Sequence, residues 1–249
     1  MSGHNRWSKI KRQKEALGAT KGRLFSKLTR ELTTAARLGG GDPAGNARLR
    51  TALDLAKAAN MPGDAITRAV KKGTGELEGV SYEEVTYEGY GPGGVALLIE
   101  CLTDNRNRTA GDVRSTLDKN GGNLASAGAV AWNFEKRGLV EVKAGPAEDQ
   151  VVEAAIEGGA EDVVNHGADG FEVRAQPADL HAVAQALEGR GLPVGERKVA
   201  LVAKDTVRLT DPERARAVLK LVDLLDELDD VQQVHANFEL DDRLLAELG

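Results

Sequence analysis

The chain changes its character near residue 79, and this change constrains its fold more than any other feature. Residues 1–78 hold 16 Lys and Arg against 7 Asp and Glu, a net charge of +9, and their apolar residues recur with helical spacing. Residues 79–249 hold 17 basic and 32 acidic residues, a net charge of −15, and there short strand-like runs alternate with helical patterns. The whole-chain charge of −6 conceals this division. The sequence therefore predicts a basic helical part joined to an acidic part of mixed helices and strands.

The basic part is expected to form three helices. Residues 21–38 place their basic side chains on one face of a helix and their apolar side chains on the opposite face. After three glycines, Asp42 and Pro43 predict an N-cap followed by proline at the first helical position, which opens a second helix through about Ala59. A third helix is expected over about residues 63–73. Together they predict a small bundle with a basic outer face.

Beyond the bundle, strands and helices follow one another in an order that predicts two α/β domains. Over residues 139–202 the pattern is strand, helix, strand, strand, helix, strand, which is the βαββαβ order of ferredoxin-like folds. The flanking elements are expected as strands over 83–88, 95–103, 130–135 and 231–237 and as helices over 109–119 and 212–228. The last helix and strand are expected to complete the unit that is unfinished at residue 135, so the middle unit is an insertion.

The predicted fold class is α+β with several domains. An N-terminal three-helix bundle is followed by two ferredoxin-like α/β domains, one of which is inserted in the other. The predicted domains are residues 1–78 with the basic arm and the bundle, residues 79–136 plus 204–249, and the inserted residues 137–203.

The composition and the scattered histidines argue against several functions. The single Cys101 excludes an intrachain disulfide, and no apolar stretch reaches the ~18 residues of a membrane span. The four histidines, which share no ligand spacing, are His4, His166, His181 and His235. No constellation of nucleophile, base or cofactor-binding residues stands out. We therefore expect a cytoplasmic protein without membrane contact that is not an enzyme and uses no metal, no cofactor and no small-molecule substrate.

The chain begins with a basic arm whose charge points to a polyanionic partner. Residues 4–37 contain Glu15 and Glu31 as their only acids. Phosphate contacts release counterions, whereas the acidic remainder of the chain repels non-specific binding. The candidate phosphate ligands in this segment are Arg6, Lys9, Lys11, Arg12, Lys14, Lys21, Arg23, Lys27 and Arg30. The other interpretation is a solvated helix face, and Trp7 either contacts the nucleic acid or anchors the arm on the bundle.

A glycine-rich loop separates the first two predicted strands. Its glycines match the G-x-G-x-x-G spacing of dinucleotide-binding loops, which needs a helix directly after the loop. A strand follows instead, so a hairpin in which glycines adopt positive φ angles is favoured. The second interpretation is a small exposed loop that approaches an RNA backbone or enters a narrow ribosomal cavity. The residues of this loop are Gly89, Gly91, Pro92, Gly93 and Gly94.

A polar run lies between the second predicted strand and the helix that follows it. In one interpretation, Asn105 or Asn107 caps the helix while Asp104 pairs with an arginine. In the other, Arg106 and Arg108 project from the strand end as phosphate ligands, because the guanidinium fork matches phosphate oxygens. Both interpretations stay open.

The C-terminal part is rich in acids and has two interpretations as well. The acids concerned are Asp223, Asp226, Glu227, Asp229, Asp230, Asp241 and Asp242. They form either a solvated face or a cover for the basic arm in the free protein.

Several of these segments resemble the YebC family. The motifs that carry the resemblance are Gly3-His4 with Trp7 and Ile10-Lys11, the runs at 21–28 and 39–43, the loop at 87–94, the run at 103–109 and the segment 159–163. They follow one another over nearly the whole chain. The resemblance implies three domains, a helical bundle and two α/β domains around a concave face, with no catalytic centre.

The family resemblance also gives the expected function. The family is described mostly as DNA-binding transcriptional regulators, so the first expectation is a non-enzymatic, DNA-binding regulator of transcription. It also includes a mitochondrial translational activator of cytochrome c oxidase and ribosome-linked roles on proline-rich nascent chains. The alternative is therefore an RNA-binding, ribosome-associated translation factor that acts on stalled or proline-rich nascent chains through rRNA contacts. Phosphate contacts do not reveal which polymer is bound, so DNA and ribosomal RNA both remain as partners, and the oligomeric state stays open.

Overall fold

A computed structural model describes residues 21–240 and residue 244 of the chain. Its helices and antiparallel sheets confirm the predicted α+β class. Internal contacts divide the chain into two units: the first includes residues 21–131 and 209–236, and the second includes residues 132–208 and 237–240. Of the helices in the described residues, none is long and apolar enough to span a lipid bilayer.

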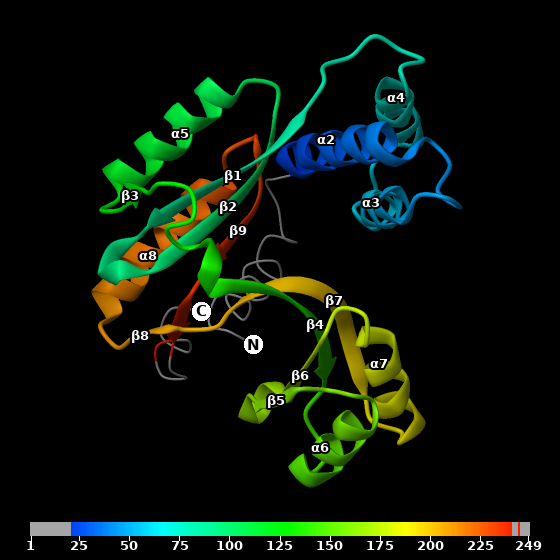
Figure 1. Cartoon of the computed structure of the whole chain (residues 1–249), viewed down its shortest axis with the longest axis vertical. Helices are drawn as coiled ribbons and strands as arrows, with labels where there is room; N and C mark the ends of the chain where they lie inside the picture. Colours follow the sequence, from blue (N-terminus) through cyan, green and yellow to red (C-terminus); the bar gives the residue numbers. More distant parts are fainter. Residues whose placement is uncertain (1–20, 241–243, 245–249) are drawn as a thin grey trace. The chain divides into compact units, whose positions relative to one another are not determined.

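Three helices at the start of the first unit form the expected bundle (Figure 1). They are α2 (Lys21–Gly39), α3 (Ala47–Ala58) and α4 (Gly63–Thr74), and α2 packs against both of the others. Their common core is rich in alanine and leucine, and it consists of Leu28, Leu32, Ala35, Ala36, Leu49, Ala52, Ala56, Met61 and Ala69. Small side chains let the helices approach closely, and a methyl group at Gly73 would lie only 2.3 Å from the carbonyl oxygen of Thr33.

The second helix of the bundle begins later than the sequence predicts. Its N-cap is Asn46, whose side-chain oxygen accepts a hydrogen bond from the backbone N–H of Leu49 at 3.0 Å. The Asn46 amide also donates to the carbonyl oxygens of Ala35 and Gly40, each at 2.8 Å. Asp42 instead accepts from the N–H of Ala44 at 2.9 Å within the preceding turn. Asn46 takes the capping position because its one buried side chain forms hydrogen bonds with backbone groups at both the end of α2 and the start of α3.

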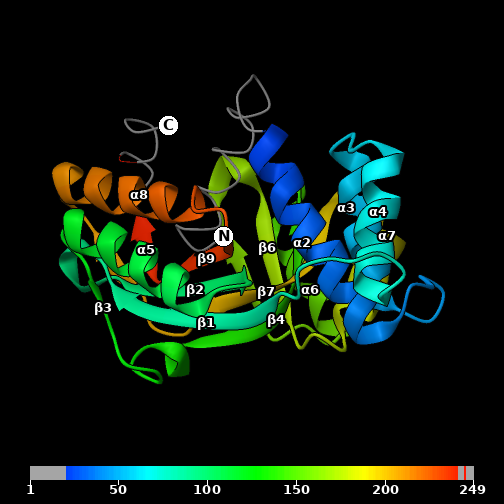
Figure 2. The ribbon, with the colours of Figure 1, turned by 90° about the horizontal axis from the view of Figure 1, so that it is seen from above.

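The rest of the first unit is a four-stranded sheet with helices on one face, as Figure 2 shows. Its elements are β1 (Glu83–Tyr90), β2 (Ala96–Thr103), α5 (Arg106–Lys119), β3 (Asn123–Leu124), α8 (Pro212–Asp226) and β9 (Val231–Ala236). The strand order is β3-β1-β2-β9 and every neighbouring pair is antiparallel. Helices α5 and α8 pack against each other and against this sheet.

The connectivity of this sheet corrects the expected ferredoxin-like order. Along the chain the elements run ββαβ and then, after the second unit, αβ, rather than βαββαβ. The spatial strand order is nevertheless that of a ferredoxin-like sheet, because β1 takes the place that the third strand of βαββαβ would occupy. The pattern of strands and helices thus predicts a sheet covered by helices. It does not predict which strand of the chain occupies which place in that sheet.

A buried glutamate holds the loop that follows β3. The Glu88 carboxylate, 7% exposed, accepts hydrogen bonds from the backbone N–H groups of Gly128 at 2.6 Å, Val130 at 2.6 Å and Ala131 at 2.8 Å. Burial by itself would raise the pKa of Glu88, but these three hydrogen bonds hold it below the ordinary value. The loop forms no β-sheet pairing at these residues, so the Glu88 carboxylate accepts the hydrogen bonds that a neighbouring strand would otherwise accept.

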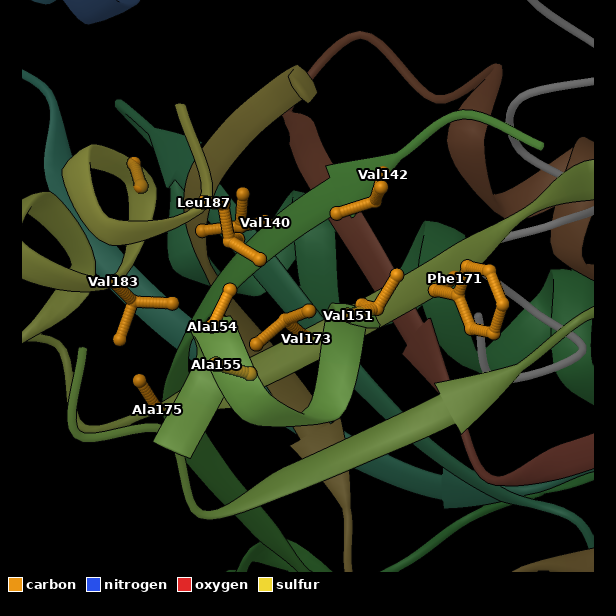
Figure 3. Packing of buried hydrophobic residues seen from close by; sticks show 11 residues of the cluster. Val140, Val142, Val151, Ala154, Ala155, Phe171, Val173, Ala175, Val183 and Leu187 are labelled. Carbon is orange, nitrogen blue, oxygen red and sulfur yellow. The ribbon is translucent and has the colours of Figure 1, made fainter. Parts of the chain in front are cut away.

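The second unit has the chain order βαββαβ. Its elements are β4 (Phe134–Val142), α6 (Glu148–Glu157), β5 (Asp162–Asn165), β6 (Phe171–Ala175), α7 (Leu180–Gly189) and β7 (Val194–Ala203), with the ferredoxin-like strand order β5-β6-β4-β7. Valines of β4 and β6 meet the inner faces of α6 and α7 in a dry core, where Val140, Val173 and Leu187 are fully buried (Figure 3). Two further short strands, β8 (Val207–Leu209) and β10 (Phe238–Leu240), pair with each other.

Strand β4 is longer than the sequence indicates. Two strands were expected, near 130–135 and from Leu139, with a domain boundary after residue 136, but one strand runs without interruption through Lys136-Arg137-Gly138. Gly138 lies inside this strand, where its lack of a side chain allows a close approach. A methyl group at Gly138 would lie 3.0 Å from Cβ of Leu180 and 3.2 Å from the carbonyl oxygen of Gln176.

Replacing the buried carboxylate with an amide tests the role of Glu88. Glu88→Gln turns one accepting oxygen into a donor that faces backbone N–H groups, so we expect the free energy of unfolding in urea to fall by about 2 kcal/mol at pH 7. Because the folded pKa lies below the ordinary value of 4.5, the difference from wild type is fully present above that pH and disappears as the pH falls below it. Glu84→Gln, an exposed change on the same strand, should cost less than about 1 kcal/mol. Equal losses in the two variants would contradict this role.

Candidate nucleic-acid interface

The predicted phosphate ligands divide into three groups. Arg6, Lys9, Lys11, Arg12 and Lys14, together with Trp7, lie outside the described residues. Lys21, Arg23, Lys27 and Arg30 lie on α2, and Arg106 and Arg108 lie in the first turn of α5.

The cations of α2 meet carboxylates from the far end of the first unit. We call residues 226–230, which run from the last residue of α8 to the start of β9, the acidic turn. Nζ of Lys27 donates to Oδ1 of Asp226 at 3.0 Å and to its carbonyl oxygen at 2.7 Å. Arg23 lies 3.2 Å from Glu227, but both side chains are about half exposed and this pair contributes little. The acidic turn thus covers part of the basic segment, which supports the second interpretation of the C-terminal acids for this stretch.

The most buried contact of the acidic turn is made by Asp230, whose side chain is 8% exposed. Its carboxylate accepts from Nη2 of Arg108 and Oγ1 of Thr109, each at 2.7 Å, and lies 3.1 Å from Nη2 of Arg30. Burial would raise the pKa of Asp230, but the hydrogen bonds from Arg108 and Thr109 hold it below the ordinary value. Since a buried charge needs partners, this carboxylate joins α2, α5 and the start of β9 into one cluster.

Arg30 is held on several sides within this cluster. It donates to the carbonyl oxygen of Asp229, and its guanidinium lies 5.6 Å from the ring centroid of Tyr82. Its side chain is only 15% exposed. Arg30 therefore acts as a link between the bundle and the sheet in this structure, rather than as an open phosphate ligand.

The polar run before α5 takes the capping arrangement. Asn105 is the N-cap, and its side chain accepts from the N–H of Arg108 at 3.1 Å. Asp104 pairs with the Arg108 guanidinium at 2.7 Å. This confirms the first of the two interpretations for Asn105 and Asp104. Arg106 is the more open arginine, with 63% of its side chain exposed and its nearest carboxylate, Glu83, at 3.8 Å.

A cavity of about 690 Å³ lies beside the Asp230 cluster. Three arginines line it, Arg23, Arg30 and Arg108, but so do five acids. The acids are Asp104, Asp112, Glu227, Asp229 and Asp230. With carboxylates in excess, the cavity repels phosphate, so its arginines do not by themselves make a phosphate site.

Other cations of the bundle are open. Within the described part of the chain, seven of them are exposed and form no ion pair with a carboxylate, and these are Lys21, Arg37, Arg50, Lys57, Arg68, Lys71 and Lys72. Of these, the sequence predicts only Lys21 as a phosphate ligand, because the density of charge along a chain does not show which cations lack partners. For Arg68, Lys71 and Lys72, the available signal is the outward face of α4, where charges recur opposite the apolar residues.

The glycine-rich loop is a hairpin between β1 and β2, as expected. Gly93 and Gly94 adopt positive φ angles of 78°, and both are exposed. Gly89 and Gly91 have ordinary angles, so their glycine identity has another cause: a methyl group would lie 2.9 Å from the carbonyl oxygen of Asn123 and 3.3 Å from Cδ2 of Leu221, respectively. Half of the motif thus serves the turn and half serves close packing.

Cys101 is unsuited to nucleophilic chemistry. It is 3% exposed on β2, and burial, together with the nearby Asp230 charge, raises the pKa of its thiol to about 12. At neutral pH it stays protonated and packs as a small apolar residue.

Comparison with known proteins places the whole chain in one group. The family model described as TACO1/YebC protein N-terminal domain matches residues 5–76, and that described as TACO1/YebC second and third domain matches residues 82–238. A protein of Myxococcus xanthus named "probable transcriptional regulatory protein" is 61% identical over 100% of this chain and 99% of its own length. A protein of the same name from Acidithiobacillus ferrooxidans is 53% identical, over 100% of this chain and 98% of its own. The crystal structure of a conserved hypothetical protein from Aquifex aeolicus is similar with a TM-score of 0.74 and 49% identity, covering 90% of this chain and 92% of that one.

Removing the charge of Asp230 tests the cluster. Asp230→Asn leaves two guanidinium groups without their shared carboxylate, so we expect the free energy of unfolding to fall by about 3 kcal/mol, measured by urea denaturation. The matched control is Asp229→Asn. That side chain is exposed, and its contact to Arg30 uses the backbone carbonyl, which the substitution keeps. If both substitutions change stability by less than about 0.5 kcal/mol, the cluster does not hold the first unit together.

Proposed function

The chain belongs to the TACO1/YebC family, and from this premise we propose that it is a DNA-binding regulator of transcription that contacts the phosphate backbone through its N-terminal third. Its relatives carry the name "probable transcriptional regulatory protein", which supports a role as a regulator. The proposed role is binding and not catalysis.

The observation that carries the proposal is the uneven distribution of unpaired positive charge. The N-terminal 78 residues hold 16 basic and 7 acidic residues, whereas the rest of the chain is strongly acidic. On the bundle, seven exposed cations have no carboxylate partner among the described residues. A surface of this kind gains free energy by replacing counterions with phosphates, and the acidic remainder disfavours contact elsewhere.

The acidic turn sets a condition on this binding. Lys27 and Arg30 reach a phosphate only after their carboxylate contacts are given up, which removes most of the gain. Among the described residues, the first contacts therefore come from the exposed cations of the bundle that form no ion pair. Lysine and arginine contacts to phosphate position a duplex without reading its bases.

Neutralising the arm tests the proposal. The variant with Lys9, Lys11, Arg12 and Lys14 changed to alanine should bind a duplex DNA more weakly. The slope of log K against log salt concentration should become flatter by about 3 to 4 units, because about four counterions are no longer released. Fluorescence anisotropy over a series of salt concentrations measures both quantities.

The control for this variant removes the same charges elsewhere. Arg114, Lys119, Lys143 and Lys220 are exposed and lie outside the N-terminal third, and their change to alanine should leave the slope almost unaltered. Wild-type protein that binds no duplex at any salt concentration refutes DNA binding. Tight binding to ribosomal RNA with none to DNA would instead favour the translation factor.

A further inference from the structure

Helix α4 has two faces with different roles. Its inner face carries Ala65, Ile66, Ala69 and Val70, which join the bundle core, and Gly73, which lies against the backbone of α2. The close approach at Gly73 fixes how the helix is turned about its axis. Consequently, the remaining positions must face outward.

The outer face of α4 is dominated by positive charge. Arg68, Lys71 and Lys72 are all exposed. Lys71 and Lys72 follow Arg68 by three and four positions, so each is a neighbour of Arg68 on the helix surface. Asp64 is the acid that shares this face, and Arg68 uses its Nε to bond the carbonyl oxygen of that residue at 3.2 Å, which leaves the outer guanidinium nitrogens available. The stem of Lys72 packs against Gly79, so its ammonium group is held at the surface.

This arrangement has an electrostatic cost in the free protein. Arg68 and Lys72 carry like charges at positions i and i+4, which destabilises a helix by a few tenths of a kcal/mol. A polyanion on this face removes the repulsion and releases counterions at the same time. Charge complementarity thus favours a phosphate backbone as the occupant.

Three other helices of the first unit carry acids beside their cations. On α3, the exposed Asp54 lies between Arg50 and Lys57 on the same face. On α2, Arg23, Lys27 and Arg30 are paired with the acidic turn. On α5, Arg114 and Lys119 alternate with Asp112 and Asp118, so that helix surface is close to neutral.

We propose that the outer face of α4, formed by Arg68, Lys71 and Lys72, is a binding surface for the phosphate backbone of duplex DNA, separate from the N-terminal arm. This inference rests on the proposed function and adds a second set of phosphate contacts to it. Contacts to phosphate oxygens carry no base information, so the proposed surface fixes the position of a duplex and not its sequence.

The test is a triple substitution of Arg68, Lys71 and Lys72 to alanine in the full chain. Alanine is a better helix former than any of the three, so the fold should be retained, which circular dichroism and urea denaturation check. We expect weaker binding of a duplex DNA and a slope of log K against log salt that is flatter by about 3 units, since about three phosphate contacts are lost. A second variant, Arg68→Lys with Lys71→Arg and Lys72→Arg, keeps the charge and should bind like wild type.

The matched control is Arg114, Lys119 and Lys220 changed to alanine. It removes one arginine and two lysines that are also exposed and outside α4, so the net charge changes equally. If wild type binds DNA and the α4 variant keeps the wild-type slope, the inference is wrong while the proposed function stands. An equal loss in the control variant overturns it too, because net charge alone then explains the effect. Failure of wild type to bind DNA overturns both proposals, and a loss confined to RNA binding overturns the assignment to DNA.

Discussion

One buried carboxylate determines how the first unit is held together. Asp230 is almost completely withdrawn from solvent, and in that environment an ionised group is stable only with charged partners and hydrogen bonds around it. It finds them on α5, in Arg108 and Thr109, and on α2, in Arg30. Because these partners come from segments more than a hundred residues away along the chain, the cluster holds the helical bundle against the sheet.

This cluster also decides which cations are available to a ligand. Counting charges places Arg23, Lys27 and Arg30 in the same positive segment as the rest of the basic third. In the folded chain, the acidic turn supplies these three cations with carboxylate partners. Arg68, Lys71 and Lys72 on α4, in contrast, form no ion pair with a carboxylate among the described residues. The electrostatic surface is therefore set by tertiary contacts, and helices with similar composition differ in what they can bind.

Local signals were sufficient to predict most helices and strands. Helical periodicity predicts α2 and α4 within a residue or two, and the capping reading of Asn105 agrees with α5. The predictions that were wrong or absent concern residues whose role depends on contacts with distant parts of the chain. Asn46 and not Asp42 caps α3, because the Asn46 side chain also bonds the end of α2. Gly138 lies inside β4, where a methyl group would come within 3.0 Å of Cβ of Leu180. No local sequence pattern predicts that Glu88 accepts hydrogen bonds from the N–H groups of a loop 40 residues later. None predicts that α8 ends beside α2 either.

Along the chain, the second unit interrupts the first, and this order affects how the protein folds during its synthesis. The βαββαβ elements of residues 134–203 emerge complete before α8 and β9, so they can assemble from near neighbours while the first sheet still lacks an edge strand and one covering helix. The contact between Lys27 and Asp226 spans 199 residues and forms only at that late stage. During synthesis, the cations of α2 thus remain without these carboxylates until nearly the whole chain has emerged.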